Sequence, residues 1–171
     1  MSNTIEFDHE FFIREYGMNL HPEGGYYVES YRSHETIPQT GLPKRFNGDR
    51  SFCSEIHFLL IGNVFSAFHR IKSDETWHFY YGHPLELIII HQDGRLQTVL
   101  MGGGPFHPCY FQFTVPQGAW FASRCTNEHG FSFAGCTVAP GFDFNDFELA
   151  APDELSNDFP AHEKLIRQFC R

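Results

Sequence analysis

The segment Phe65–Gly82 reads FSAFHRIKSDETWHFYYG. Two aromatic-rich runs with the character of β-strands flank a short polar turn at residues 72–74. His69 lies near the end of the first run, and Glu75 opens the second. An antiparallel pair joined by a tight turn brings such residues together, so we expect His69 and Glu75 to share a cavity. There they could hold a metal ion or transfer a proton.

Side chains alternate between the two faces of a strand, so the sequence predicts which residues lie on the same face as His69 and as Glu75. On the first strand, Ile71 shares the face of His69. On the second strand, the residues that share a face are Glu75, Trp77, Phe79 and Tyr81. His78 takes the opposite face unless a bulge intervenes.

Outside this window the strand pattern continues with regular breaks. Runs at a spacing of about 8–12 residues, with turn residues between them, are typical of an all-β sandwich or barrel. Asp93-Gly94 predicts a hairpin, because both residues tolerate a positive φ. The predicted strands are 26–31, 52–61, 65–71, 75–81, 85–91, 96–101, 110–115, 119–124 and 131–138.

Short helices are predicted near both ends. Residues 8–16 form one, with Asp8 capping its start and Gly17 ending it, and residues 160–169 form the other. Residues 33–51 read as a long polar loop. Residues 142–149 (FDFNDFEL) read as an edge strand or an extended arm. We expect residues 1–171 to form one domain.

Composition narrows the functional classes. The chain of 171 residues has a net charge of −9, which argues against a nucleic-acid partner, because phosphates require a basic face. No apolar run is long enough to predict a membrane span or a signal peptide. Five cysteines without a CxxC motif predict no disulfide framework, so we expect a cytoplasmic protein.

Four longer strings carry a resemblance to a known family. They are HPEGGYYVESYRS (21–33), FHRIKSDETWHFYYGHPLEL (68–87), VPQGAWFAS (115–123) and GCTVAPGFDFNDFEL (135–149). With them the chain resembles the cupin-5 (DUF985) family of the RmlC-like cupins. The resemblance implies a double-stranded β-helix, the cupin jelly-roll barrel, with a core over about residues 22–149. It also implies a homodimer, for which the strand 26–31 is our candidate contact.

The match to the metal-binding cupin motifs is incomplete. His69 and Glu75 stand at the first histidine and the glutamate of the pattern, but Ile71 and Phe121 occupy the other two histidine positions. Since a divalent metal wants three or four protein ligands, we expect no cofactor. A metal would have to recruit a further ligand, for which the candidates are His57, His78 and His107.

A cavity with apolar walls and a few polar groups instead suits a small organic ligand. Its expected lining residues are Ile71, Trp77, Phe79, Gln112, Trp120, Phe121, Glu29 and Arg32. Three functions stay open. The first is a metal-independent isomerase or epimerase of a sugar-like molecule, with His69 as base, Glu75 orienting it and Tyr81 as acid. The second is a non-catalytic binding cupin, and the third is a metal-dependent oxygenase that uses His69, Glu75 and His78.

Overall fold

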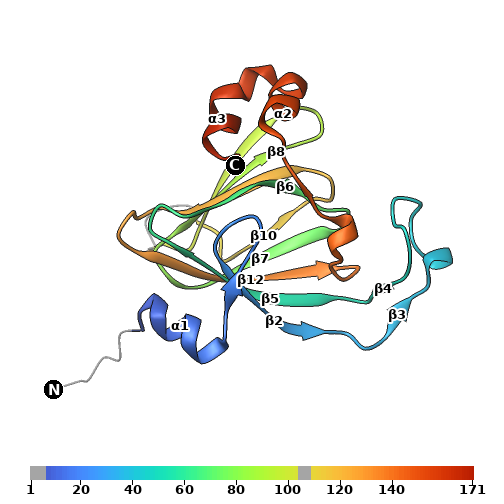
Figure 1. Ribbon diagram of the computed structural model, residues 1–171, viewed down its shortest axis with the longest axis horizontal. Helices are drawn as coiled ribbons and strands as arrows, with labels where there is room; N and C mark the ends of the chain where they lie inside the picture. The colour runs from blue at the N-terminus through green and yellow to red at the C-terminus, as the bar shows by residue number, and fades with distance from the viewer. Residues whose placement is uncertain (1–6, 104–108) are drawn as a thin grey trace.

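Two antiparallel sheets face each other in the computed structural model, which describes residues 7–103 and 109–171 (Figure 1). Together they form the jelly-roll barrel of a cupin, as predicted. The larger sheet contains, in order, β1 (Asn19–Leu20), β2 (Tyr26–Arg32), β5 (Ser54–Ile61), β12 (Phe131–Ala139), β7 (Asp74–Gly82) and β10 (Gln112–Val115). The smaller sheet contains β13 (Glu148–Leu149), β6 (Phe65–Arg70), β11 (Trp120–Cys125), β8 (Leu85–Ile90) and β9 (Leu96–Met101).

The turn between β6 and β7 crosses from one sheet to the other. β6 pairs with β11 and β13, whereas β7 pairs with β12 and β10. The expected antiparallel pairing of these two strands is therefore wrong. The local signals of a turn are the same for a hairpin and for a connection between facing sheets. In contrast, Asp93-Gly94 does join a true hairpin, because β8 and β9 pair in register from Leu85↔Met101 to Ile90↔Leu96.

The N-terminal helix α1 (His9–Tyr16) has the predicted caps. Asp8 accepts a hydrogen bond from the Phe11 amide at 2.8 Å, and Gly17 takes the left-handed conformation with φ of 63°. Phe12 fixes the helix to the larger sheet by stacking on Phe133, with ring centroids 4.2 Å apart. The helix therefore covers the outer face of that sheet.

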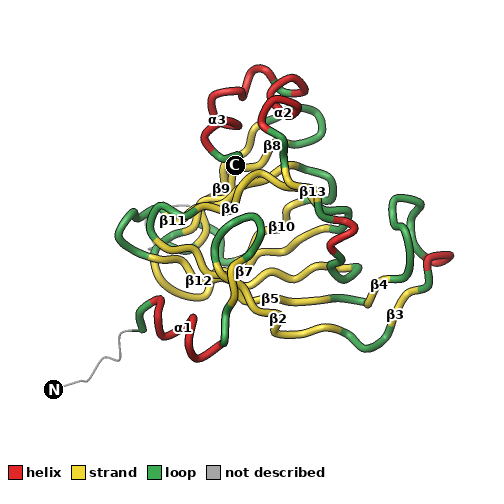
Figure 2. The backbone as a smooth tube through the Cα atoms, in the orientation of Figure 1, coloured by secondary structure: helices red, strands yellow, loops and turns green. Residues whose placement is uncertain are grey.

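The C-terminal region is more helical than expected. The predicted helix over 160–169 is divided into a 3₁₀ turn, η3 (Pro160–His162), and α3 (Glu163–Gln168), and a further helix, α2 (Pro152–Asp158), precedes them. Leu155 and Ile166 bury themselves against Phe68 and Ile90 on the outer face of the smaller sheet. Figure 2 shows both helices together above that sheet.

The predicted loop over 33–51 and the predicted edge strand or arm over 142–149 both contain short elements. Residues 33–51 hold η1 (Gln39–Gly41) and a ribbon of β3 (Thr36–Ile37) with β4 (Arg50–Ser51), which extends beyond the sheets in Figure 2. Residues 142–149 hold η2 (Phe144–Asp146) and β13, which pairs with β6. A buried ion pair between Arg50 and Asp146, with both N–O distances 2.6 Å, joins the two segments.

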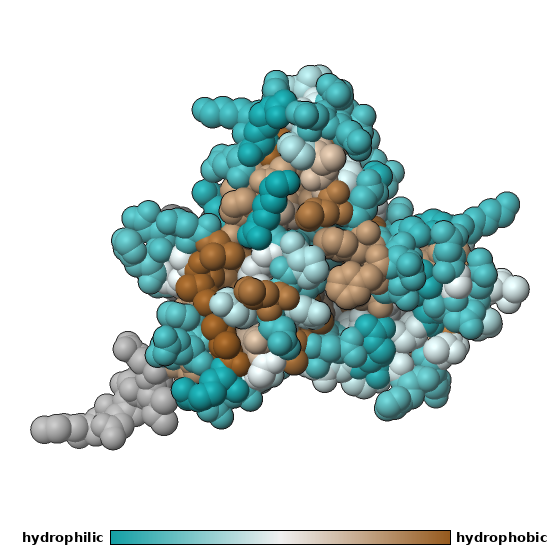
Figure 3. Space-filling view, viewed as in Figure 1, coloured by the Kyte–Doolittle hydropathy of each residue, from teal (hydrophilic) through white to brown (hydrophobic). Residues whose placement is uncertain are grey.

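Packed side chains fill one part of the space between the sheets, and a cavity occupies another part. Trp77, Leu87, Met101 and Phe121 belong to the filled part and are almost fully buried. Figure 3 shows a further apolar area on the outside of the barrel, between the C-terminal helices and α1. In the described ranges, 7–103 and 109–171, no helix is long and apolar enough to cross a membrane.

Candidate functional site

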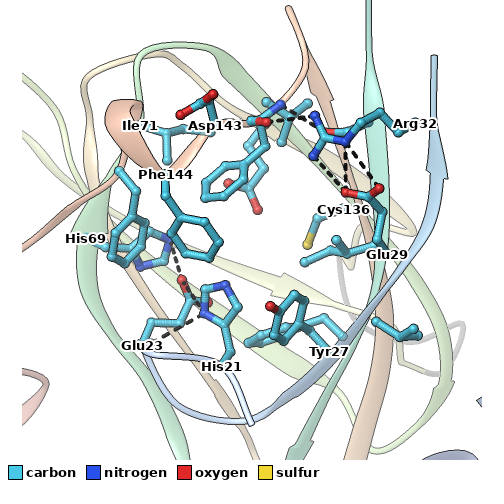
Figure 4. A pocket seen from close by; sticks show the side chains of 18 of the residues that line it. His21, Glu23, Tyr27, Glu29, Arg32, His69, Ile71, Cys136, Asp143 and Phe144 are labelled. Carbon is cyan, nitrogen blue, oxygen red and sulfur yellow. Dashed lines mark hydrogen bonds and ion pairs between the residues drawn. The ribbon is translucent and has the colours of Figure 1, made fainter. Parts of the chain in front are cut away.

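A cavity of about 450 Å³ lies between the two sheets, next to the filled core. This volume is within the usual range of about 300–1,000 Å³ for small-molecule sites. Its lining includes two histidines and two glutamates with buried side chains: His21, Glu23, His69 and Glu75. Five aromatic rings also line it: Tyr27, Phe58, Phe142, Phe144 and Phe147. The cavity therefore combines apolar walls with a few ionisable groups (Figure 4).

The HPEGG turn between β1 and β2 delivers two of the four groups. Its backbone is closed by hydrogen bonds from the His21 amide to Gly25 and from the Gly24 amide to His21, both 3.0 Å long. Gly24 has φ of 110°, and a Cβ there would collide with the carbonyl oxygen of Phe65. The Ala67 amide donates to the Glu23 carbonyl at 2.8 Å. The turn is thus held directly on β6, which carries His69.

Glu23 and His69 form a buried pair that shares one proton. Glu23 Oε2 lies 3.1 Å from His69 Nε2. His69 Nδ1 lies 2.8 Å from the Ala67 carbonyl, which can only accept, so Nδ1 carries the ring proton. Ser66 Oγ donates to Glu23 Oε1 at 2.8 Å. In a neutral ring, Nε2 must then accept its hydrogen bond from a protonated Glu23.

Burial favours this neutral form of the pair. It raises the pKa of Glu23 well above its usual value, and the nearby Glu75 raises it further. It lowers the pKa of His69 to about 3. Water is too scarce in this wall to stabilise a carboxylate and an imidazolium. At neutral pH the proton therefore resides on Glu23 and points to His69.

His21 completes this side of the cavity. Its Nδ1 accepts from the Glu23 amide at 3.4 Å, and the ring lies perpendicular to that of Tyr27, with centroids 4.5 Å apart. Burial lowers the pKa of His21 to about 4. His21 is thus a second uncharged imidazole beside the Glu23–His69 pair.

Glu75 occupies the facing sheet. The residue is 7% exposed, and burial raises its pKa to about 7, while interactions with Cys136 and Trp77 oppose the shift. A carboxyl group with a pKa near neutral pH can both accept and donate a proton there. The cavity thus has a titratable acid on the larger sheet and, on β6 of the smaller sheet, a neutral His69 that is paired with Glu23 of the β1–β2 turn.

Five of the residues predicted for the site line the cavity: His69, Glu75, Ile71, Glu29 and Arg32. The Arg32 guanidinium lies at its edge, where it forms hydrogen bonds to Glu29, to Ser51 Oγ and to the Phe142 carbonyl. Trp77, Phe79 and Phe121 are not among the lining residues. They face the barrel interior but pack in or against the filled core.

Strand register explains why two further predicted ligand-binding residues point outward. Gln112 pairs with His78 at the sheet edge, and directly paired residues share a face, so Gln112 is exposed on the outside. Trp120 pairs with Ile90, which faces the C-terminal helices. There Trp120 packs below the Arg70 guanidinium, 4.4 Å from its ring centroid. Their predicted place in the cavity is corrected accordingly.

Tyr81 also lies outside the cavity. The register of β7 against β12 shifts between Phe79 and Tyr81, which is the mark of a β-bulge. Tyr81 is therefore 39% exposed and packs against Phe12 and Phe131. Simple alternation along β7 does not hold beyond the bulge, and this side chain does not reach His69.

The candidate metal ligands are not gathered in one place. His78 bonds to Thr137 Oγ1 at 3.0 Å on the outer face, and His57 packs there against Tyr16, while His107 lies outside the described residues. Ile71 and Phe121 offer only hydrocarbon. Within residues 7–103 and 109–171, no three or more His, Cys, Asp or Glu side chains are grouped so as to hold a metal ion. The side chains do not fit the three-histidine, one-glutamate set of metal-binding cupins.

His21 and Glu23 are functional candidates that the sequence analysis missed. Turn residues such as those of HPEGG (21–25) do not reveal where their side chains point. The available signal was the presence of a histidine and a glutamate beside two glycines, inside a string that resembles the family.

Comparison with known proteins agrees with this architecture. A hypothetical protein from Leishmania major is 33% identical over 96% of this chain and 99% of its own, with a TM-score of 0.86. A protein from Shewanella oneidensis is 34% identical over 97% and 99%, with a TM-score of 0.87. Oxalate decarboxylase from Bacillus subtilis, at 16% identity over 88% and 36% and a TM-score of 0.51, shares the fold alone.

A search of curated proteins finds no match. The family model described as "Cupin superfamily (DUF985)" matches residues 10–150. This match spans most of the barrel together with both segments that carry the four proton-exchanging side chains. The chain therefore belongs to the Cupin_5 (DUF985) family of the cupin superfamily.

Proposed function

We propose that the protein is a metal-independent isomerase or epimerase that acts on a small, sugar-like carbonyl compound in the barrel cavity. One observation carries this proposal. Two separate proton-exchanging units line the same cavity: Glu75 on β7 of the larger sheet, and the pair of His69, on β6 of the facing sheet, with Glu23, in the β1–β2 turn. A ligand between them would have an acid–base group on each side, which is the arrangement that a two-step proton transfer requires.

The proposed chemistry moves two protons. Glu75 takes a proton from the carbon next to the carbonyl group, and the C–H electron pair becomes part of an enediol. Glu23 gives the carbonyl oxygen the proton that it otherwise donates to His69 across the 3.1 Å contact. Glu75 then returns its proton to an enediol carbon, and an enediol hydroxyl gives a proton back to Glu23 as the carbonyl group re-forms. Protonation of the neighbouring carbon gives the isomer, and protonation of the same carbon on its opposite face gives the epimer. The aromatic rings of the wall would pack against the apolar face of a sugar ring.

Solvent exchange tests this mechanism without knowledge of the physiological substrate. A panel of aldoses and ketoses is incubated with the protein in D₂O, and deuterium at the carbon next to the carbonyl is followed by NMR. We expect exchange with the native protein and a loss of about 10²-fold or more with Glu75→Gln. His78→Gln is the matched control, because His78 lies on the outer face of the same strand.

A second candidate is a non-catalytic binding cupin. It is favoured by the hydrogen bonds around the Glu23–His69 pair, which need no ligand to complete them. Glu23 bonds to Ser66 and to His69, and the other ring nitrogen of His69 bonds to the Ala67 carbonyl. Such a wall is rigid, which suits recognition. Ligand binding with no deuterium exchange for any bound sugar would support this candidate and contradict the isomerase.

We also propose a cytoplasmic homodimer. The thiols of Cys53, Cys125, Cys136 and Cys170 are free, which agrees with a reducing compartment. Tyr31 on β2 and Leu20 on β1 are exposed near an edge of the larger sheet, where a second copy could cover them. Sedimentation should give about twice the chain mass of 19.8 kDa, and a monomer at micromolar concentration would contradict the dimer.

A further inference from the structure

The cavity holds buried acids but no cation that pairs with them. Glu23 and Glu75 are both buried, and among the described residues neither forms an ion pair with a lysine or arginine. Glu23 is neutral in its pair with His69, so Glu75 is the buried acid that can carry a charge at neutral pH, and burying a carboxylate without a partner is strongly unfavourable. A ligand that brings its own positive charge would remove this penalty.

Because the buried acid lacks a cationic partner and aromatic rings line the mouth of the cavity, we propose that the ligand carries a protonated amine. The inference rests on the proposed small-molecule function of the same cavity and names the class of molecule that it accepts. An amino sugar or a similar polar amine meets both requirements, because it combines a carbonyl or hydroxyl framework with a compact positive charge.

Three phenylalanines at the mouth have the arrangement of adjacent walls of a box. The centroid of Phe144 lies 5.0 Å from that of Phe142 and 6.2 Å from that of Phe147, and the third distance is 6.3 Å. The planes meet at 82°, 73° and 68°. The negative faces of such rings attract ammonium groups within about 6 Å of their centroids.

Phe144 is the most informative of the three. It is 53% exposed although it belongs to the cavity wall, and its ring is nearly parallel to that of His21 with centroids 6.2 Å apart. Figure 4 shows it close to His69 and His21. A large apolar ring that is half in water at a cavity mouth is available to cover a ligand.

The charges at the mouth also disfavour anions. Asp143 lies between Phe142 and Phe144 in the chain and lines the cavity with Glu29. Arg32 is the single lysine or arginine among the described lining residues, and its guanidinium is already used. Nε and one terminal nitrogen donate to Glu29, and the other donates to Ser51 and to the Phe142 carbonyl. A phosphate or carboxylate would find no free cation there.

A matched set of ligands tests the preference for an amine. The intact protein is titrated with glucosamine, glucose and glucuronate, and with benzylamine, benzyl alcohol and benzoate, and dissociation constants are taken from NMR shifts. We expect the amine of at least one set to bind ten-fold or more tightly than its alcohol, and the acid to bind most weakly. Equal binding of amine and alcohol, tighter binding of an acid, or no binding by any amine would overturn the proposal.

A substitution at Phe144 tests whether the preference for an amine arises at the mouth of the cavity. Phe144→Leu keeps an apolar side chain but removes the ring, and it should weaken the amine about 3- to 30-fold while leaving the alcohol within two-fold. Phe111→Leu is the matched control, because Phe111 is exposed and is not among the cavity-lining residues. An equal loss for amine and alcohol would contradict a role for the ring in charge recognition. An amine preference without deuterium exchange would uphold this inference and reject only the isomerase.

Discussion

His69 and Glu75 face the same cavity from different sheets, although only the turn at residues 70–74 separates them along the chain. One short connection therefore places an imidazole and a carboxyl group on opposite walls. A hairpin would have placed both on one wall, where they could act on the ligand from one side only. The crossing between sheets places Glu75 opposite His69, which in the proposed mechanism is the partner of the acid Glu23.

Glu75 should make the protein less stable as the pH rises through the weakly acidic range. Burial raises its pKa from 4.5 in the unfolded chain to about 7 in the folded protein. The unfolded chain therefore releases this proton first, so stability falls between pH 4.5 and 7. Glu75→Gln should remove up to about 3 kcal/mol of this loss at pH 7 and above. Urea unfolding at pH 4.5 and 7.5 measures it, and a gain that is equal at both pH values would contradict the raised pKa.

His69 should have the opposite dependence, on the acid side. Its pKa is lowered to about 3 in the folded protein from 6.5 in the unfolded chain, because burial disfavours the imidazolium. Below pH 6.5 the unfolded chain gains a proton that the folded chain does not, so this group lowers stability as the pH falls from 6.5 towards 3. His69→Gln should flatten the acid side of the pH–stability curve. NMR titration of the ring is the direct check, and a His69 pKa near 6.5 would refute the buried neutral pair.

The HPEGG turn should tolerate no side chain at Gly24. Gly24→Ala places a Cβ against the Phe65 carbonyl oxygen at φ of 110°, so the turn must move away from β6. We expect a loss of more than about 2 kcal/mol of unfolding free energy and a weakened Glu23–His69 contact. Gly17→Ala is the matched control, since Gly17 also has a positive φ but nothing lies within 4 Å of the added Cβ. It should cost only about 1–2 kcal/mol. An equal loss for both variants would show that backbone conformation alone sets the cost.

The Arg50–Asp146 pair should contribute far more than the exposed pairs. Arg50→Met leaves Asp146 buried with Lys72 as its remaining cation, at 3.3 Å, so we expect a loss of about 3 kcal/mol. Arg124→Met removes the partly exposed contact with Glu86 and should cost under about 1 kcal/mol. Urea unfolding compares the two, and a loss below 1 kcal/mol for Arg50→Met would contradict a tie between the two segments.

Deuterium exchange, where it occurs, should not depend on a bound metal. Ile71 and Phe121 supply no donor atoms, and both ring nitrogens of His69 already have partners. Treatment with a strong chelator should therefore leave the exchange rate of the purified protein unchanged. A rate that falls on chelation and returns with one added metal would reject the metal-independent mechanism.

Strand positions were predictable because alternation and turn residues are local. The predicted strands 85–91 and 131–138 correspond closely to β8 (Leu85–Ile90) and β12 (Phe131–Ala139). Sheet membership is not local, which is why β6 and β7 were expected to pair. The bulge that redirects Tyr81 is likewise set by its partner strand β12.

Strand alternation predicted one part of the candidate site. His69 and Ile71 follow from parity on β6, and both line the cavity. His21 and Glu23 come from a turn, and turns have no simple face rule. Their place depends on the amide of Ala67, a contact across more than 40 residues that no local pattern encodes.

The Phe142–Phe147 segment is attached to the barrel in a way that should allow its sequence to be replaced. It supplies three rings and a carboxylate to the cavity mouth, yet it lies outside every strand, and Asp146 anchors it through Arg50. Grafting a different sequence between the Arg32-bound carbonyl of residue 142 and the Asp146 anchor would alter what the mouth recognises while the acid–base groups on the sheets stay in place. Under the proposed function, this loop sets ligand selectivity while the acid–base groups of the barrel set reactivity, so replacing one short loop should change the ligand preference.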